Sequence, residues 1–208
     1  YKGKRLVNWC PKQMTSISDL EIETREEKGK FNYFNYQLVG GGVIEIATTR
    51  PETLFGDQAI AVHPENEKLK HLVGQYAIIP LTNIEIPIIA DEHADPEKGT
   101  GAVKITPAHD FDDWEVGVRH NLKPVCILTP DAKLNDNPVV PEKYRGMDRY
   151  KAREAIVADI DAAGLLVKIE DKIIPTPYSE RAQVPVEPYL TDQWFVDAEK
   201  LAIPAIKA

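Results

Sequence analysis

Two polar stretches of the sequence carry residue types that can do chemistry. The first, EIATTRPETLFGDQAIAVHP over residues 45–64, places threonines, an arginine and a glutamate between two apolar runs. Thr49-Arg50-Pro51-Glu52 has the spacing of a capping box, and Gly56 follows where a single helical turn would end. The free backbone N–H groups of such a turn, together with Arg50, could bind an anion or a carbonyl oxygen. The alternative is a purely structural turn, with Arg50 paired to Glu52 or exposed to solvent.

The second stretch, GTGAVKITPAHDFDDWEVG over residues 99–117, combines a lysine with several carboxylates. In a strand through VKIT, Lys104 and Thr106 point to the same face. A helix that starts near Asp110 places Asp110 and Asp113 on one side of that helix. The junction of strand and helix would then gather these four side chains. Two carboxylates beside an ammonium group suit the capture of a substrate amino group, or general acid–base work.

The acidic residues of the second stretch could also have a purely structural role, because negative charges at the start of a helix complement its dipole. This structural role is sufficient to explain Asp112 and Glu115. For Asp110 and Asp113 both interpretations stay open.

Other chemistries find little support in the sequence. His63 and His109 have no second ligand at a spacing such as H-x-x-x-H, so structural roles are predicted for them rather than metal binding. There is no Gly-rich phosphate loop and no G-x-S-x-G elbow, and Ser179 has no evident base. No cofactor and no metal are therefore expected.

Short strands separated by turns must position these residues. Strand periodicity is found over residues 30–39, 40–48, 58–64, 76–89, 101–106, 165–170 and 172–178, with a Gly-Gly-Gly hairpin turn at 40–42. Helices are predicted over 64–74, 109–121 and, most clearly, 148–164, which ends on a capping glycine. The expected fold is mainly β with peripheral helices (α+β), arranged as a compact β-barrel-like domain.

Composition narrows the classes of function. The 208 residues are 43% hydrophobic and 28% charged, enough for one sizeable core. The net charge of −8 argues against broad nucleic-acid binding but allows a local basic pocket. Cys10 and Cys126 form no C-x-x-C pair, so free thiols are expected. No export signal or membrane-spanning run of about 18 apolar residues is found. Because the chain begins with Tyr1, an excised piece of a larger protein is expected.

Three long motifs resemble the editing domain that is inserted in the class I aminoacyl-tRNA synthetases for valine, isoleucine and leucine. They are ATTRPETLFGDQAIAVHPEN, GTGAVKITPAHDFDDWEVG and VEPYLTDQWFV, with LVNWCPK near the start. The resemblance spans essentially the whole chain, and the Thr-Arg-Pro-Glu-Thr turn combined with AVKITPAHD is most similar to the valine kind. It implies a single editing domain over residues 1–208, in which 1–20 and 185–208 connect to the rest of the synthetase.

The resemblance implies an activity and a set of site residues. The activity is hydrolysis of the ester bond of threonyl-tRNA(Val), in the cytoplasm, with no membrane involved. The partners are the 3′ acceptor end of tRNA(Val) carrying threonine and the remainder of the synthetase chain. The implied catalytic residues are Lys104, Thr106, Asp110 and Asp113. The implied substrate-binding residues are Thr48, Thr49, Arg50, Glu52, Thr53, Asp57 and His109.

Within this set the resemblance implies roles. Lys104 and Thr106 would hold the ester or order the attacking water. Asp113 would bind the α-ammonium group, and Asp110 would lie near the substrate hydroxyl or the terminal ribose. Which aspartate meets which group stays open.

The sequence departs from the family pattern in two places. Lys98 stands where an aromatic residue is frequent, which puts a stacking contact to the terminal adenine in doubt, and Asp112 stands where asparagine is frequent. The H-I-G-H and K-M-S-K-S type signatures of aminoacylation are absent, so this chain is not expected to bind ATP productively or to charge tRNA.

Three alternatives remain. The chain could edit for the isoleucine or leucine enzyme, which deacylation of different mischarged tRNAs would reveal. It could bind the tRNA acceptor end without hydrolysis, although Lys104, Thr106, Asp110 and Asp113 are all present. It could be a generic acidic hydrolase on a small β-barrel, which would act on simple esters without tRNA.

Overall fold

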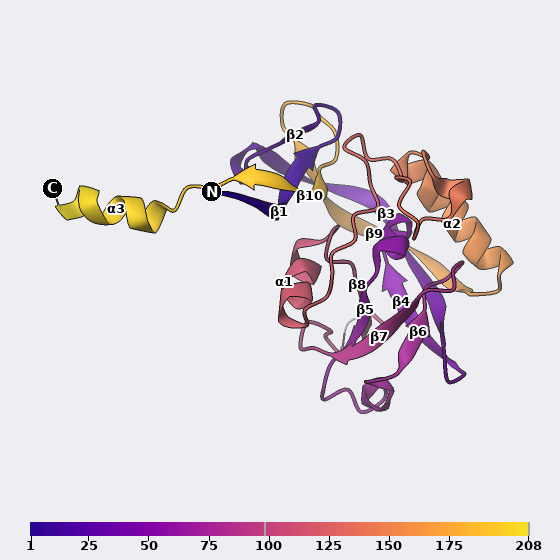
Figure 1. Ribbon diagram of the computed structural model, residues 1–208. Coiled ribbons are helices and arrows are strands. Elements are labelled where there is room, and N and C mark those ends of the chain that lie inside the picture. Colours follow the sequence, from indigo (N-terminus) through magenta and orange to yellow (C-terminus); the bar gives the residue numbers. More distant parts are fainter. Residues whose placement is uncertain (98, 208) are drawn as a thin grey trace.

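The computed structural model describes residues 1–97 and 99–207, and its architecture is mainly β (Figure 1). Lys98, one of the two departures noted above, lies outside the described residues. In a small sheet, β1 (Lys2–Cys10) pairs antiparallel with β10 (Glu187–Trp194) and with β2 (Thr15–Ser16). The N-terminal strand β1 and the strand β10 are therefore held side by side by backbone hydrogen bonds.

The larger sheet forms the body of the domain. Its strands follow the order β4-β3-β6-β7-β5-β8, with β9 added to β3. The outermost strands of this order, β4 and β8, contact each other, so the sheet curls toward closure. The prediction of a mainly β, barrel-like domain with peripheral helices is thus confirmed. The strands are β3 (Ile22–Leu38), β4 (Val43–Thr48), β5 (Ala59–Val62), β6 (Tyr76–Ile78), β7 (Glu85–Ala90), β8 (Ala102–Ile105) and β9 (Leu166–Ser179).

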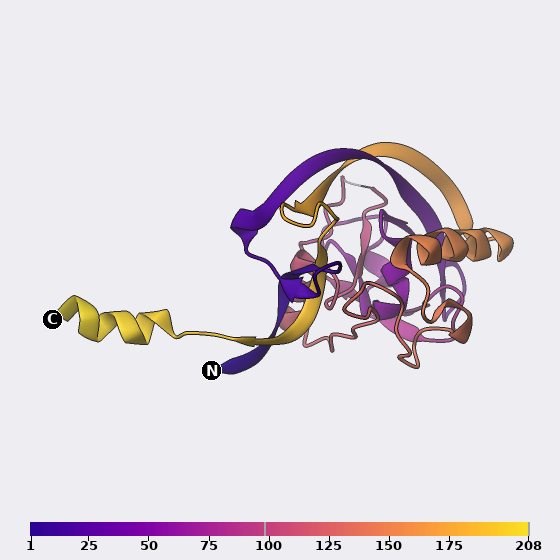
Figure 2. The same cartoon turned by 90° about the horizontal axis from the view of Figure 1, so that it is seen from above.

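The longest strands, β3 and β9, form an antiparallel ribbon that arches over the body (Figure 2). The far half of β3 also pairs with β4, and the connecting turn contains Gly41 and Gly42 at φ of 91° and 92°. These backbone angles are easy only for glycine, which explains the Gly-Gly-Gly hairpin signal.

Two helices, α1 (Phe111–Arg119) and α2 (Arg149–Ala162), pack on the outside of the curled sheet. A third helix, α3 (Ala198–Lys207), follows β10. In α2, Ala152, Ile156 and Ile160 recur every four residues and are buried, and the Asp148 side chain caps the first turn. Gly164, at φ 70°, follows the last turn, as the sequence predicts.

Four short 3₁₀ turns complete the described secondary structure of residues 1–97 and 99–207. They are η1 (Asp19–Glu21), η2 (Pro51–Gly56), η3 (Lys70–Leu72) and η4 (Glu142–Tyr144). The helix expected over residues 64–74 is reduced to η3, because Asn66 turns the chain with its side chain. Its Oδ1 accepts hydrogen bonds from the N–H groups of Lys68 and Leu69.

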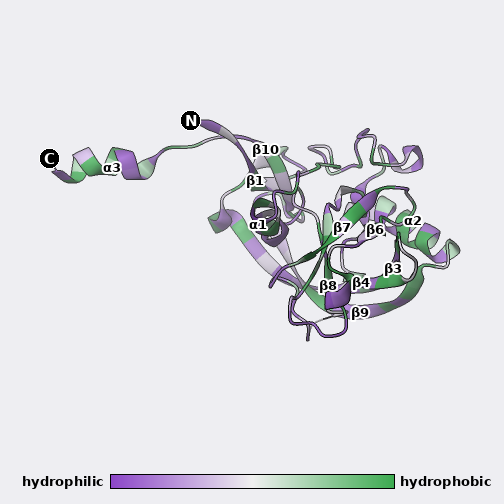
Figure 3. Ribbon diagram, turned by 60° about the horizontal axis from the view of Figure 1, so that its bottom comes forward, coloured by the Kyte–Doolittle hydropathy of each residue, from purple (hydrophilic) through white to green (hydrophobic). Residues whose placement is uncertain are grey.

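The main hydrophobic core lies inside the curl of the large sheet. Phe34, Ile46, Leu54 and Ile60 are fully buried there, and α2 closes the core with its apolar face. Figure 3 shows hydrophobic stretches of ribbon on β4 and β7, and hydrophilic ribbon on the outer loops. Packing against this core fixes η2, the turn that carries the first polar motif.

The terminal segments lie apart from the curled sheet. After β10 the chain leads into α3, which extends away from the body and has no buried residue among those described (Figure 1). The assignment of residues 1–20 and 185–208 as connecting segments stays a prediction. Cys10 is buried and Cys126 partly so, and both thiols are free. Among the described residues, no helix has the length and hydrophobicity needed to cross a bilayer.

Candidate functional site

A polar cavity of about 240 Å³ opens where η2, the end of β8 and the start of α1 meet. Every predicted site residue except Glu52 and Asp57 lines this cavity, so the structure brings the two polar motifs together. These lining residues are Thr48, Thr49, Arg50, Thr53, Lys104, Thr106, His109, Asp110 and Asp113.

Lys104 sits at the floor of the cavity and is only 8% exposed. Its Nζ lies 3.0 Å from Thr53 Oγ1 and 3.0 Å from Asp57 Oδ1, and it also donates to Thr106 Oγ1. An ammonium group has three N–H donors, so these three acceptors match its capacity. Lys104 is therefore a fixed positive charge at the base of the site.

Asp57 lies behind Lys104 and does not line the cavity. Its carboxylate accepts hydrogen bonds from Tyr36 Oη at 2.5 Å and from Thr106 Oγ1 at 2.5 Å, in addition to Lys104. Burial raises the pKa of Asp57, while the Lys104 charge and the hydroxyl donors act against that rise. In this position Asp57 holds Lys104 and Thr106 in place rather than reaching a ligand.

Asp113, in the first turn of α1, brings a nearly buried carboxylate to the cavity wall. Its Oδ2 accepts a hydrogen bond from the Thr106 backbone N–H at 2.8 Å, and His93 Nε2 lies 3.6 Å from Oδ1. Burial raises the pKa of Asp113 to about 7, with the Lys104 charge lowering it and the Asp110 charge raising it. A cationic ligand group would stabilise the ionised form of this carboxylate.

Asp110 is more exposed and serves as the N-cap of α1. Its Oδ1 accepts hydrogen bonds from the backbone N–H groups of Asp112 at 2.9 Å and Asp113 at 3.2 Å. Both interpretations that the sequence left open for Asp110 are thus compatible with its position, because the capping carboxylate also lines the cavity. Asp112, the second departure from the family pattern, is exposed at the cavity rim.

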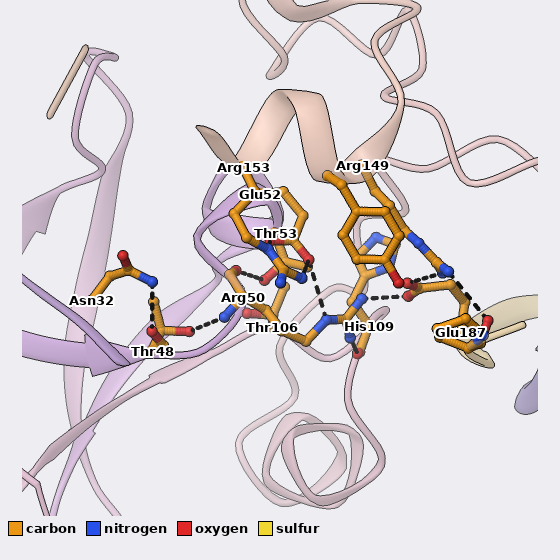
Figure 4. A network of polar contacts seen from close by, with 12 residues as sticks. Asn32, Thr48, Arg50, Glu52, Thr53, Thr106, His109, Arg149, Arg153 and Glu187 are labelled. Carbon is orange, nitrogen blue, oxygen red and sulfur yellow. Dashed lines mark hydrogen bonds and ion pairs between the residues drawn. The ribbon is translucent and has the colours of Figure 1, made fainter. Parts of the chain in front are cut away.

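Arg50 connects the cavity to a buried network of charges (Figure 4). Its Nη1 donates to the His109 carbonyl oxygen at 2.8 Å, its Nη2 donates to the Glu187 carboxylate, and its Nε lies 3.4 Å from Glu52 Oε1. Burial lowers the pKa of Arg50, but the charges of Glu187, Glu52 and Asp110 raise it more. Arg50 therefore stays a cation.

The capping box expected over residues 49–52 is wrong, although the turn itself forms as η2. The N-cap is Arg50, whose side chain makes no capping hydrogen bond, and Thr48 Oγ1 accepts from the Arg50 N–H at 3.0 Å. Glu52 is turned away from the N-terminus of the turn, since both its oxygens lie 2.8 Å from Arg153 donors. Glu52 is fully buried and, like Asp57, does not line the cavity.

His109 is a buried neutral imidazole at the side of the cavity. Its Nε2 accepts a hydrogen bond from the Ile127 N–H at 3.0 Å, so the proton of the neutral ring is on Nδ1. Burial, followed by the Arg50 and Lys104 charges, lowers the pKa of His109 well below its ordinary value. Within residues 1–97 and 99–207 no group of three or more His, Cys, Asp or Glu side chains is arranged to hold a metal ion.

Sequence reasoning did not select several residues that the fold brings to the site. His93 faces Asp113, and Phe31, Ala47 and Val103 supply apolar wall. Glu187 lies within a motif that was recognised, yet its pairing with Arg50 spans 137 residues. No periodicity or spacing in the sequence signals such contacts, because they depend on which elements pack together.

The cavity suits a ligand with a cationic group next to a carbonyl group. Asp113 offers a carboxylate for an ammonium, and Lys104 offers a positive potential for a carbonyl or a developing oxyanion. Threonine hydroxyls around the wall can donate and accept hydrogen bonds. No serine or cysteine is among the described lining residues.

Comparison with known proteins gives a consistent result. The family model described as "tRNA synthetases class I (I, L, M and V)" matches residues 1–208. The chain is 55% identical to a valine–tRNA ligase of Zymomonas mobilis, with 100% of this chain and 24% of that protein covered. It is 54% identical to a valine–tRNA ligase of Francisella tularensis, with 100% and 22% covered. The chain thus spans about a quarter of the length of the curated relatives it matches.

Proposed function

The chain belongs to the class I tRNA synthetases of the isoleucine, leucine, methionine and valine group, and we propose that it is the editing domain of a valine–tRNA ligase. Its reaction is hydrolysis of the ester that joins threonine to tRNA(Val). The observation that carries the proposal is Asp113, a nearly buried carboxylate in the same cavity as Lys104 and four threonines. Such a cavity can hold the ammonium and ester groups of an aminoacyl end together.

The physical need for this reaction comes from the similarity of valine and threonine. The two amino acids are near isosteres, and a hydrophobic pocket cannot strongly reject an isostere that only adds a hydroxyl. For the valine enzyme, the discrimination between valine and threonine in the synthetic pocket is only about 10². A second site that hydrogen-bonds the hydroxyl can discriminate further, because valine would leave its polar groups unpaired.

Asp113 binds the α-ammonium group of the threonyl ester. Its Oδ2 is held by the Thr106 N–H, and its Oδ1 is the oxygen nearer to His93. Charge-assisted hydrogen bonds of this kind are about twice as strong as neutral ones. The ionised form is required, and the substrate ammonium itself favours that form by lowering the pKa of the carboxyl group.

Lys104 acts through its charge and its fixed position. Its donors already meet Thr53, Thr106 and Asp57, so a direct hydrogen bond to the ester carbonyl requires one threonine contact to be exchanged. Even without that exchange, a preorganised ammonium in a nearly buried site stabilises negative charge that develops on the ester. Asp57 is the positioning residue that keeps Lys104 oriented.

The remaining residues surround the terminal adenosine and the water. Thr48, Thr49 and Arg50 form the side of the cavity assigned to the adenosine, and Asp110 lies at its rim near the ribose or the threonine hydroxyl. No side chain is a strong base within reach, since the neutral His109 ring is bound by Ile127. The attacking water is therefore assigned partly to a ribose hydroxyl of the substrate.

The test is deacylation of threonine-charged tRNA(Val), with valine-charged tRNA(Val) as the control substrate. For the full synthetase, we expect loss of threonine and retention of valine. The same result is expected for this chain alone if the rest of the synthetase is not needed to present the acceptor end. Asp113→Asn keeps the size of the side chain and removes its charge, so it should abolish loss of threonine. Glu115→Gln, at an exposed position on the same helix, is the matched control and should retain activity.

Other outcomes would redirect the assignment. Preferred deacylation of mischarged isoleucine or leucine tRNA would move the domain to a sister enzyme. Binding of tRNA with no hydrolysis by the full synthetase would identify a non-hydrolytic module. Hydrolysis of simple esters at a rate independent of tRNA would support a general hydrolase.

A further inference from the structure

His93 lines the polar cavity, and the reaction proposed above does not use its ring. It lies in the turn that follows β7, and its side chain is 27% exposed. Among the described residues, the only polar partner of its ring is Asp113, with 3.6 Å between His93 Nε2 and Asp113 Oδ1. That separation is too long for a hydrogen bond, so both atoms keep their capacity to bind a ligand.

The position of His93 is fixed by the carboxylate of Asp91. The His93 backbone N–H donates to Asp91 Oδ1 at 2.9 Å. At the end of α1, Arg119 Nη2 donates to the same carboxylate at 2.9 Å, and His120 Nε2 lies 2.8 Å from it. Burial raises the pKa of Asp91, but the hydrogen bonds from Arg119 and the His93 N–H lower it to about 2. Asp91 is therefore ionised at neutral pH and ties the turn to α1.

The residue after His93 anchors the turn in the protein interior. Ala94 is fully buried and belongs to a small apolar cluster with Ile105 of β8 and Val116 of α1. Its backbone N–H donates to the Asp91 carbonyl oxygen at 3.3 Å. The turn thus has an ionic and an apolar anchor on the helix whose first turn carries Asp113. The His93 ring and the Asp113 carboxylate form a prearranged pair.

The spacing of this pair matches the two polar groups of threonine. The ammonium and hydroxyl groups of threonine are on adjacent carbon atoms, so they lie side by side when the rotamer is gauche. With the ammonium on Asp113 Oδ1, the hydroxyl can meet His93 Nε2, which is 3.6 Å from that oxygen. A hydroxyl both donates and accepts, so it can bind either tautomer of the imidazole. Valine has a methyl group in this place and cannot form the bond.

The other polar side chains that act on Asp113 are already engaged. Lys104 and Thr106 bond to each other, and both also bond to a buried carboxylate behind the wall. Asp110 caps α1 with one oxygen, and its charge interacts with that of Arg50, on the side assigned to the adenosine. The imidazole is therefore better placed than these groups to receive the hydroxyl.

We propose that the His93 imidazole binds the side-chain hydroxyl of the threonyl ester, beside the ammonium group held by Asp113. The inference rests on the proposed function and deepens it, because it names a residue that distinguishes threonine from valine. A bound valine would leave the imidazole nitrogen against a methyl group without a hydrogen bond. His93 contacts the substrate and takes no part in the hydrolytic step, and Asp110 is left to the terminal ribose.

The experiment compares two esters in the full synthetase. One is threonine-charged tRNA(Val), and the other is tRNA(Val) charged with 2-aminobutyrate, which has a hydrogen in place of the hydroxyl. His93→Phe keeps an aromatic ring and removes both ring nitrogens. It should lower kcat/KM for the threonyl ester about fivefold, which is the loss of one neutral hydrogen bond. The 2-aminobutyryl ester should keep its wild-type kcat/KM.

Two further variants make the test specific. His93→Gln can place an amide nitrogen near the position of Nε2, so it should retain most of the preference for the threonyl ester. His71→Phe, at an exposed histidine of η3, is the matched control and should change neither ester. Circular dichroism melts of each variant would separate a folding defect from a binding defect.

Two results would overturn the assignment of His93 while leaving the proposed function intact. One is an equal loss on both esters in His93→Phe, which would identify a role in shaping the cavity rather than in binding the hydroxyl. The other is an unchanged kcat/KM for the threonyl ester.

A binding measurement keeps the test independent of hydrolysis. The threonyl amide of 3′-amino-3′-deoxyadenosine resists hydrolysis, and it should bind the full synthetase more tightly than the matching 2-aminobutyryl amide. His93→Phe should remove most of that difference, and because His93 belongs to this chain, the change reports on this cavity. If the wild type hydrolyses neither ester but shows this His93-dependent preference, the hydroxyl contact stands and the proposed function falls. If His93→Phe leaves the relative binding of the two amides unchanged, the hydroxyl contact is wrong.

Discussion

Glu52→Gln is the substitution for which the structure makes the sharpest prediction. The Glu52 carboxylate is fully buried in η2, with two Arg153 donors at 2.8 Å and Arg50 Nε at 3.4 Å. Glutamine has nearly the same shape, so packing is retained. The change removes the negative charge and places an amide N–H₂ group where one oxygen accepted a hydrogen bond from an arginine.

The magnitude follows from what remains of the charge network. Removing one partner of a buried ion pair costs about 3–5 kcal/mol, because the other charge is left uncompensated. Arg50 keeps Glu187, and Arg153 is a third exposed and can regain water, so the lower end applies. We expect a loss of about 3 kcal/mol in the free energy of unfolding at pH 7. For a domain of this size, that loss corresponds to a fall in Tm of roughly 6–12 °C.

The dependence on pH gives a second signature. Burial alone would raise the pKa of Glu52, but the hydrogen bonds from Arg153 and the charges of Arg153 and Arg50 lower it below its ordinary value of 4.5. A carboxyl group with a lowered pKa stabilises the fold above its ordinary pKa, and this stabilisation is lost as the pH falls through the folded-state value. The gap between wild type and Glu52→Gln should therefore narrow below about pH 4.

Urea denaturation from pH 7 down to acid measures both quantities. Glu170→Gln is the matched control, because Glu170 binds Lys168 and Tyr33 on the surface and its loss should change stability little. A gap under about 1 kcal/mol at pH 7, or one that does not narrow in acid, would refute the reasoning. A variant of unchanged stability that loses deacylation would instead favour Glu52 as a direct substrate contact.

Three further predictions concern Asp113, Tyr36 and Gly117. Because burial raises the pKa of Asp113 to about 7, kcat/KM for deacylation should fall as the pH drops below about 7, once spontaneous hydrolysis is subtracted; a flat profile from pH 6 to 8 would count against ammonium binding by Asp113. Tyr36→Phe deprives the buried Asp57 of a hydroxyl donor and should cost about 1.5–3 kcal/mol in urea denaturation, and an unchanged midpoint would mean that Asp57 does not depend on this bond. Gly117→Ala would place a Cβ 2.9 Å from two Pro107 ring atoms and should lower Tm, since overpacking of about 1–3 kcal/mol exceeds the gain in helix propensity of about 1 kcal/mol; a raised Tm would show that Pro107 can yield.

Local patterns in the sequence were sufficient for most of the secondary structure. The Gly-Gly-Gly turn joins β3 to β4, and the four-residue spacing of apolar residues in α2 places them in the core. The strand β8, which carries Lys104, ends at Ile105, and after a turn Asp110 caps α1. These features depend on backbone preferences and side-chain periodicity within a few residues, so they can be predicted from the sequence alone.

The capping box failed for a reason that lies outside the local sequence. Thr49 and Glu52 have the correct spacing, but the Glu52 carboxylate binds Arg153, which is 101 residues away. A bidentate ion pair with an arginine is stronger than a single hydrogen bond to a backbone N–H. The tertiary contact therefore overrode the local one.

The sequence by itself determined the kinds of element, the polar motifs on η2 and β8–α1, and a resemblance that predicted the site residues. Only the tertiary structure decided which of those side chains face the cavity and which support it from behind. It turned Asp57 and Glu52 inward to hold Lys104, Arg50 and Arg153, and it brought His93 and Glu187 to the site. The physical reason is that a buried charge must be paired, and the partner that satisfies it is chosen by packing across the fold rather than by neighbours along the chain.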